Sequence, residues 1–168
     1  MKSVVLLSFC ILLRSFCQEP LSNFALIDLG NLSSSKKTEA SVFERSHFKK
    51  FQLVSCYYKH IYRSGDVLVG FQDFILPKDI DLSQHERELV GEVEEAETAG
   101  LKQKSYQIRC NNLKFVVREV NKGDENFYYF CSGTKNGHGI KGIVLYKTCD
   151  STKASQVFTT LLKRMKMR

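Results

Sequence analysis

Short segments in which apolar and polar residues alternate dominate the second half of the chain. Turn residues bound each segment, and the turns are rich in Asn, Gly and Asp, which tolerate the positive φ angles of tight turns. Because these turns are short, the segments predict strands that pair antiparallel in a meander. The four predicted strands are residues 105–110, 113–120, 126–131 and 140–148.

The third of these strands is apolar on both faces. Alternation places Phe127, Tyr129 and Cys131 on one face. Tyr128 and Phe130 then lie on the other face. Both faces must therefore be covered, one by a core or a cavity and the other by an element that packs outside the sheet.

The last segment of the chain predicts an amphipathic helix over residues 152–167. Its apolar residues recur every three or four positions, and Ser151 or Thr152 can cap the first turn. We expect this apolar stripe to pack against the sheet. The stripe consists of Val157, Phe158, Leu161, Leu162 and Met165.

The first half of the chain predicts a hairpin of residues 51–58 and 67–76 around the turn Ser64-Gly65-Asp66. Residues 83–99 fit a helix and a solvent-edge strand equally well. Residues 18–40 lack a sustained period and are predicted to form an N-terminal arm. We therefore expect one mainly β domain over residues 41–168, which is an ordinary length for a single domain.

Residues 1–17 have the layout of a signal peptide. Lys2 precedes an apolar run of about ten residues, which Arg14 ends. This run is too short to span a membrane, which takes about 20 residues. Ser15 and Cys17 fit the small positions before a cleavage site, which would leave Gln18 at the mature N-terminus. We expect a secreted, extracellular protein with no integral membrane association.

Four cysteines remain in the predicted mature chain: Cys56, Cys110, Cys131 and Cys149. None lies in a CxxC or CxxH pattern, so their spacing does not indicate a metal site. In an exported protein an even number of cysteines favours structural disulfides over free thiols, with three possible pairings. Asn31-Leu32-Ser33 is a glycosylation sequon in a polar, Ser-rich stretch, so we expect a glycan on Asn31.

Residues 93–167 resemble the lipocalin family. The segments that carry the resemblance are Glu97-Thr98-Ala99-Gly100 followed by Tyr106, residues 115–120, 127–131 and 144–148, and the helical segment 151–165. The family's Gly-x-Trp motif is missing, and Lys49-Lys50-Phe51 stands in its place. The resemblance implies an antiparallel up-and-down β-barrel, complete, shortened or incomplete, with the C-terminal helix packed outside.

A barrel of this kind binds one small hydrophobic ligand in its calyx, with alternate strand residues turned inward. Tyr129 would hydrogen-bond a polar end of the ligand. The alternative is that these side chains fill a solid core, because strand periodicity defines two faces without showing which one encloses a cavity. The candidate ligand-binding residues are Phe115, Val117, Phe127, Tyr129, Ile143 and Leu145.

Catalytic, metal-binding and cofactor motifs are missing from the sequence. The four histidines are scattered, and the chain has no HExxH, no Gly-x-Ser-x-Gly and no phosphate-binding glycine loop. We therefore expect a carrier or scavenger of a small hydrophobic ligand that is not an enzyme, uses no cofactor and binds no nucleic acid.

Two other functions fit the sequence. The first is a secreted inhibitor or signalling protein, cystatin-like or cytokine-like, that acts through its surface on an extracellular protein receptor or target. In the cystatin-like form a sheet would wrap a helix at residues 38–50, although the Gln-x-Val-x-Gly loop is missing. The second is a glycan or heparin binder, because the formal net charge is +7 and the basic residues gather after Gly100.

Export can be tested directly. Expressed in secreting eukaryotic cells, the full chain is expected to reach the medium with Gln18, cyclised to pyroglutamate, at its N-terminus and a glycan on Asn31. Intact mass before and after glycosidase treatment measures both changes, and Asn31→Gln is expected to remove only the glycan. An uncleaved chain retained in the cell would contradict the expectation.

Overall fold

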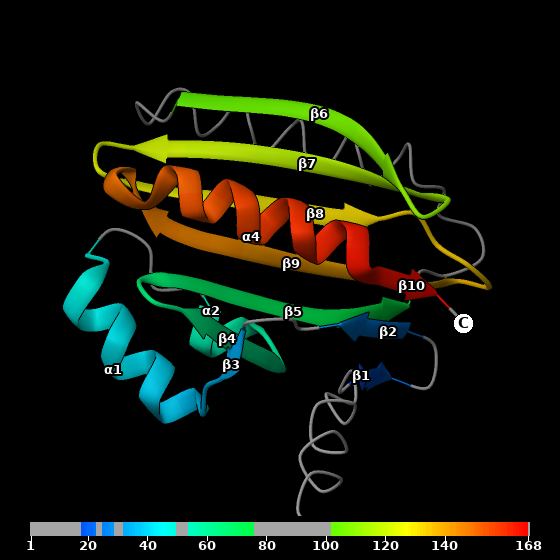
Figure 1. Cartoon of the computed structure of the whole chain (residues 1–168), viewed down its shortest axis with the longest axis horizontal. Coiled ribbons are helices and arrows are strands. Elements are labelled where there is room, and N and C mark those ends of the chain that lie inside the picture. The colour runs from blue at the N-terminus through cyan, green and yellow to red at the C-terminus, as the bar shows by residue number, and fades with distance from the viewer. Residues whose placement is uncertain (1–17, 23–24, 29–31, 50–53, 76–101, 168) are drawn as a thin grey trace, which may run out of the picture.

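The computed structural model describes residues 18–22, 25–28, 32–49, 54–75 and 102–167. Its centre is a seven-stranded antiparallel sheet in the order β3-β4-β5-β9-β8-β7-β6 (Figure 1). The strands are β3 (Ser33–Ser34), β4 (His60–Ser64), β5 (Val67–Ile75), β6 (Lys102–Cys110), β7 (Leu113–Lys122), β8 (Glu125–Ser132) and β9 (His138–Lys147).

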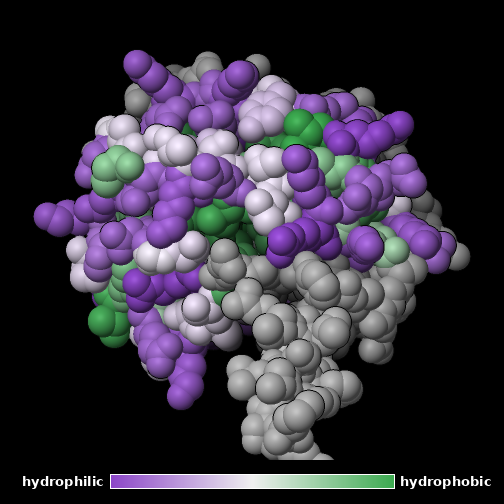
Figure 2. All heavy atoms as spheres, viewed as in Figure 1, coloured by the Kyte–Doolittle hydropathy of each residue, from purple (hydrophilic) through white to green (hydrophobic). Residues whose placement is uncertain are grey.

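Helices cover both faces of this sheet. Helix α4 (Ser151–Arg164) crosses one face (Figure 1). On the other face, residues of α1 (Lys37–His47) and the short α2 (Val54–Tyr57) form a second core with the strands. A 3-10 turn, η1 (Thr148–Asp150), joins β9 to α4. We call the two sides of the sheet the α4 face and the α1 face. The surface on the α4 side is largely hydrophilic (Figure 2).

The predicted meander is confirmed, because β6 to β9 pair in sequence order and their bounds fall within a few residues of the predicted strands. Asn111, Asn112 and Gly123 have the positive φ angles expected of the turns. The next neighbour is not sequential: β5 pairs with β9, from Leu68 opposite Leu145 to Ile75 opposite His138. Strands β3 and β6 are therefore the two edges among the strands that the structure describes.

The prediction of a closed, lipocalin-like calyx is wrong for this sheet. Its two edge strands do not pair with each other, and helices fill the space on both faces. A barrel needs one face turned to a lumen, whereas here each face contributes to its own core. The coarser expectation, a mainly antiparallel β domain with a C-terminal helix packed on the sheet, is confirmed.

The core on the α4 face centres on aromatic rings. Phe158 of α4 stacks on Tyr128 with 4.7 Å between ring centroids and 6° between planes. It also contacts Phe130, at 5.9 Å. Gly142 makes room for the Phe130 ring, because a Cβ at that position would collide with it. The predicted apolar stripe thus packs as expected, with Phe158, Leu161, Leu162 and Met165 buried.

Helix α4 ends three residues before the predicted boundary. Met165–Met167 form β10, which pairs with β2 (Ala25–Asp28), and β2 also pairs with β1 (Gln18–Ser22). The side-chain amide of Asn111 donates to the carbonyl oxygens of Lys163 and Met165 and so occupies the end of the helix. Residues 18–40 are therefore not a separate arm, since they supply β1, β2, β3 and the start of α1.

The predicted hairpin is confirmed in part. Strands β4 and β5 pair around Gly65, but the predicted strand 51–58 is wrong because Val54–Tyr57 is helical. The cause is a tertiary contact: the buried carboxylate of Glu44 accepts hydrogen bonds from the backbone N–H of Val54 (2.7 Å) and Ser55 (3.1 Å). These are the amides that begin a helical turn and need an acceptor.

The predicted pair of disulfides is not formed. Cys110 and Cys149 are free thiols, and they lie at opposite ends of the sheet, about 30 Å apart along the strands. A disulfide needs Cα atoms within about 7 Å. Two intrachain disulfides would use all four cysteines of the predicted mature chain, including Cys110 and Cys149, so the structure does not contain the predicted pair.

The predicted signal peptide, the sequon Asn31 and the ambiguous segment 83–99 lie outside the described residues. No helix in the described part of the chain has the length and apolar character of a membrane span.

The thiol assignment predicts selective alkylation. Iodoacetamide added to the unreduced, secreted protein is expected to modify Cys149, which is exposed, and more slowly Cys110, which is half-buried. Peptide mass spectrometry measures the modification at each cysteine. Complete protection of both until a reductant is added would show that both are in disulfides.

The Glu44 contact predicts a stability loss. Glu44→Ala leaves two backbone amides near Val54 without their acceptor and is expected to lower the free energy of unfolding by about 2 kcal/mol. Urea denaturation measures the change. The exposed Glu39, which accepts one bond from the backbone N–H of Lys36, is the control, with an expected loss of about 0.5 kcal/mol for Glu39→Ala.

Candidate functional site

The six predicted ligand-binding residues lie on both faces of the sheet. Phe115 and Val117 are fully buried on the α4 face, because the register pairs them with Ser132 and Phe130. The other four lie on the α1 face, where the register pairs Phe127 with Leu145 and Tyr129 with Ile143. A sheet separates the two groups, so they cannot line one cavity.

The solid-core alternative describes most of these residues. Phe115 and Val117 pack in the core under α4. Ile143 and Leu145 are buried in the core under α1 and α2, with Phe127 partly buried at its margin. Their role in this fold is to hold the helices on the sheet.

The structure has a hollow elsewhere, which we call the tyrosine groove. It lies on the α4 face, where α4 begins and the β7–β8 turn closes the sheet, and its volume is about 480 Å³. Its lining residues are Lys102 of β6, Glu119 and Asn121 of β7, Asn126 and Tyr128 of β8, Tyr146 of β9 and Ser151 of α4, together with Gly123 and Thr148.

Strand register explains why these residues meet. Glu119 is opposite Tyr128, so one row across the sheet carries a carboxylate beside a phenol. In the next row Asn126 lies between Asn121 and Tyr146. Polar side chains thus replace the apolar rows of the core at this end of the sheet, and the first turn of α4 stands beside them.

Stacked rings form one side of the groove. Tyr146 stacks on Tyr128 with 5.2 Å between centroids, and Tyr128 in turn stacks on Phe158. A side-chain hydrogen bond joins Tyr146 to Tyr128. The two tyrosines are therefore fixed by core packing, which gives the groove a rigid wall.

Burial and charge keep the phenols protonated. Burial first, and then the nearby Glu119 carboxylate and Tyr128, raise the pKa of Tyr106, which adjoins the groove, to about 12. Burial, the hydrogen bond with Tyr128 and the surrounding negative charge also raise the pKa of Tyr146. At neutral pH these groups are neutral hydroxyls that can donate or accept hydrogen bonds.

Glu119 brings a negative charge into the groove without a direct counter-ion. It is half-buried, and among the described residues no hydrogen bond or ion pair reaches its carboxylate. Lys104 is opposite it in the β6–β7 register, but the ammonium group of Lys104 lies over the ring of Tyr106, 5.6 Å from the centroid. The carboxylate is therefore available to a ligand.

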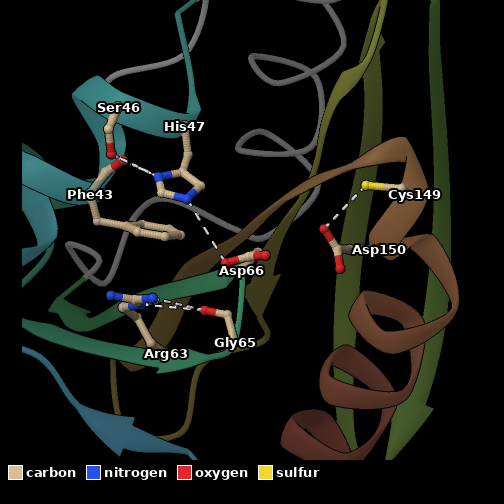
Figure 3. A network of polar contacts seen from close by, with 8 residues as sticks. All are labelled: Phe43, Ser46, His47, Arg63, Gly65, Asp66, Cys149 and Asp150. Carbon is tan, nitrogen blue, oxygen red and sulfur yellow. Dashed lines mark hydrogen bonds and ion pairs between the residues drawn. The ribbon is translucent and has the colours of Figure 1, made fainter.

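A second, more open hollow lies between α1 and β4. Its volume is about 470 Å³, and Val42, Phe43 and Arg63 line it together with Thr38, Glu39 and Ser46. The guanidinium group of Arg63 lies 3.8 Å from the Phe43 ring centroid and donates to the carbonyl oxygen of Gly65 (Figure 3). Arg63 thus ties α1 to the β4–β5 turn.

Ser46, His47 and Asp66 meet beside this hollow, in the residue types of a hydrolase triad (Figure 3). Nδ1 of His47 lies 2.7 Å from the Ser46 hydroxyl, and Nε2 lies 3.9 Å from the Asp66 carboxylate. The Ser46 hydroxyl, however, donates to the carbonyl oxygen of Phe43 at 2.9 Å. We interpret the trio as a polar clip between the end of α1 and the β4–β5 turn.

The residues of the tyrosine groove were not predicted from the sequence. The alternation of side chains along β8 correctly placed Tyr128 on the face opposite Phe127 and Tyr129. The pairing register of β7 with β8 sets Glu119 beside Tyr128, and this register cannot be predicted from a local pattern. The Asn-Gly-Asp-rich turn at 121–124 was a usable signal, because it located the polar end of the sheet.

Removing the Glu119 charge is expected to lower the pKa of Tyr106 toward its usual 10.0. Between pH 10 and about 12 the unfolded chain has lost the Tyr106 proton while the folded chain keeps it, so stability falls as pH rises through that window. Glu119→Gln is expected to narrow the window. NMR titration of tyrosine ring carbons measures the pKa, and an unchanged value would contradict the assigned cause; Glu39→Gln is the control.

Comparisons with known proteins give no family for this chain. No family model and no curated protein matches the sequence. Among solved structures, the chain is similar to cyanobacterial PsbP from Synechocystis sp. PCC 6803, with 13% identical residues, a TM-score of 0.46, and coverage of 65% of this chain and 74% of that one. The resemblance to lipocalins finds no support in these comparisons.

Proposed function

We propose that the protein is a secreted binding protein, without catalytic activity, that takes a small polar ligand into the tyrosine groove. The proposal is based on one observation: Glu119, Asn126 and Tyr128 come from neighbouring strands and line the same hollow. Its volume of about 480 Å³ lies within the range of small-molecule sites, which combine aromatic walls with a few placed polar groups.

The proposal keeps the carrier or scavenger role but replaces the hydrophobic ligand expected from the sequence with a polar one. The apolar surfaces that would hold a hydrophobic molecule are occupied by α4 on one face and by α1 and α2 on the other. The groove offers hydroxyl, amide and carboxylate groups instead. The signal-peptide pattern of residues 1–17 supports the extracellular location.

Binding fits the groove chemistry better than catalysis does. Tyr106 and Tyr146 have raised pKa values, so they remain protonated at neutral pH and act as hydrogen-bond partners rather than bases. The stacked Tyr128 and Tyr146 are held in place before a ligand arrives, which lowers the entropic cost of binding.

A second candidate is action through the surface on an extracellular protein. Val42 on α1 is 63% exposed and Tyr57 on α2 is 65% exposed, so two apolar side chains face solvent from the helices on the α1 face. Helix α1 supports the cystatin-like alternative, because it precedes every strand of the seven-stranded sheet except the two-residue β3. Val42→Asp would abolish such an interaction and leave ligand binding in the tyrosine groove unchanged.

The groove can be tested by blocking it. In an NMR screen of small polar fragments, shift changes are expected to cluster at residues 119–128 and at Ser151. Ser151 is exposed at the groove, so Ser151→Trp is expected to fill the hollow without disturbing the core and to abolish these changes. Thr160→Trp, exposed on the opposite side of the same helix, is the matched control. Scattered shifts that survive Ser151→Trp would contradict the proposal.

A further inference from the structure

The charge of Glu119 narrows the chemistry of the ligand. A half-buried carboxylate loses part of its hydration, and the loss must be offset by a hydrogen bond or an opposite charge. Within the described chain Glu119 has neither a hydrogen bond nor an ion pair, and it lies close enough to Tyr106 and Tyr146 to help raise the pKa of both phenols. The group that would complete this site is a cation or a strong hydrogen-bond donor.

Hydroxyl and amide groups surround Glu119, because Asn121, Asn126, Tyr128 and Tyr146 line the same hollow. Asn126 is hydrogen-bonded to Thr148 and Tyr146 to Tyr128, whereas the Glu119 carboxylate has no hydrogen-bond or ion-pair partner among the described residues. A protonated primary amine has three N–H donors and one positive charge, so it matches a carboxylate flanked by such groups. A neutral hydroxyl would satisfy one acceptor and leave the charge uncompensated.

The chain already places one ammonium group beside this site. Lys104 extends from the strand residue opposite Glu119 and sits over the Tyr106 ring, in an aromatic contact that favours cations. Lys102 lies at the exposed rim of the groove and is the positive charge in its lining. The Tyr106 ring and the Glu119 carboxylate therefore attract an ammonium group, and Lys102 lies at the rim of the groove.

We propose that the ligand of the tyrosine groove carries a protonated primary amine whose nitrogen pairs with the Glu119 carboxylate. This inference rests on the proposed function, because it names the ligand class of the same groove. The ring of an aromatic amine would lie against the edges of Tyr128 and Tyr146, and its ammonium group would reach Glu119.

Benzylamine and benzyl alcohol form a matched pair of probes, because they share size and ring and differ in charge at neutral pH. By NMR titration of the mature chain, benzylamine is expected to bind the groove at least about tenfold more tightly than benzyl alcohol. In Glu119→Gln the two probes are expected to bind equally. Glu39→Gln, which alters an exposed carboxylate at α1, is expected to keep the tenfold difference.

Lys104 provides an independent variant. Since its ammonium group competes for the same negative region, Lys104→Gln is expected to tighten benzylamine binding about two- to threefold and to leave benzyl alcohol unchanged. Raising the salt concentration is expected to weaken benzylamine alone, as ions screen the charge.

Four results would overturn the inference. Equal binding of both probes to the wild-type groove would leave the groove as a binding site but exclude amine recognition. A benzylamine preference that survives Glu119→Gln would place the amine elsewhere. Binding of neither probe, together with no fragment bound in the groove, would remove the proposed function as well; binding of neutral fragments alone would remove only the amine.

Discussion

Strand β8 is apolar on both faces, and the rest of the structure depends on covering both. On one face Phe158 of α4 stacks on Tyr128 and contacts Phe130. On the other, α1 and α2 bury the neighbouring apolar residues, with Phe127 at the margin. A calyx needs one of these faces to remain hollow, so two-sided burial produces an open sheet between helices rather than a barrel. Pairing of β5 with β9 sets β9 and its buried side chains at the centre of that sheet.

The groove exists because the apolar rows end before the sheet does. Phe158 covers the row that contains Tyr128, whereas the next row towards the β7–β8 turn carries Asn121 and Asn126. Ser151 begins α4 above this polar end, so the helix roofs the core and leaves the groove open beside it. The same burial that fixes the tyrosines also raises the pKa of Tyr146, and the half-buried Glu119 lies beside them. The tyrosines that pack in the core under α4 therefore also form the wall of the proposed binding groove.

Local patterns predicted the local features well. A periodicity of two residues predicts the meander and the strand with two apolar faces, and a periodicity of three to four residues predicts the apolar stripe of the last helix. Turn residues predict the turns at Asn111-Asn112 and Gly123. Features set by distant contacts were not predictable in this way. The helical turn at Val54–Tyr57 depends on the carboxylate of Glu44, and the sequence there is rich in strand-forming residues. Phe115 and Phe130 share a face because of the β7–β8 register. The same register places the predicted ligand-binding residues on two faces of the sheet, and it sets Glu119 beside Tyr128 in the groove.

The central claim is that both faces of an open sheet are filled, with α4 on the face of Tyr128 and Phe130. A NOESY spectrum of the isotopically labelled mature chain tests it most directly. We expect contacts from the Phe158 ring to Tyr128 and Phe130, and between the backbones of Val69 and Val144 across β5 and β9. Contacts from Phe158 to Phe127 or Tyr129, or the lack of contacts between β5 and β9, would contradict it.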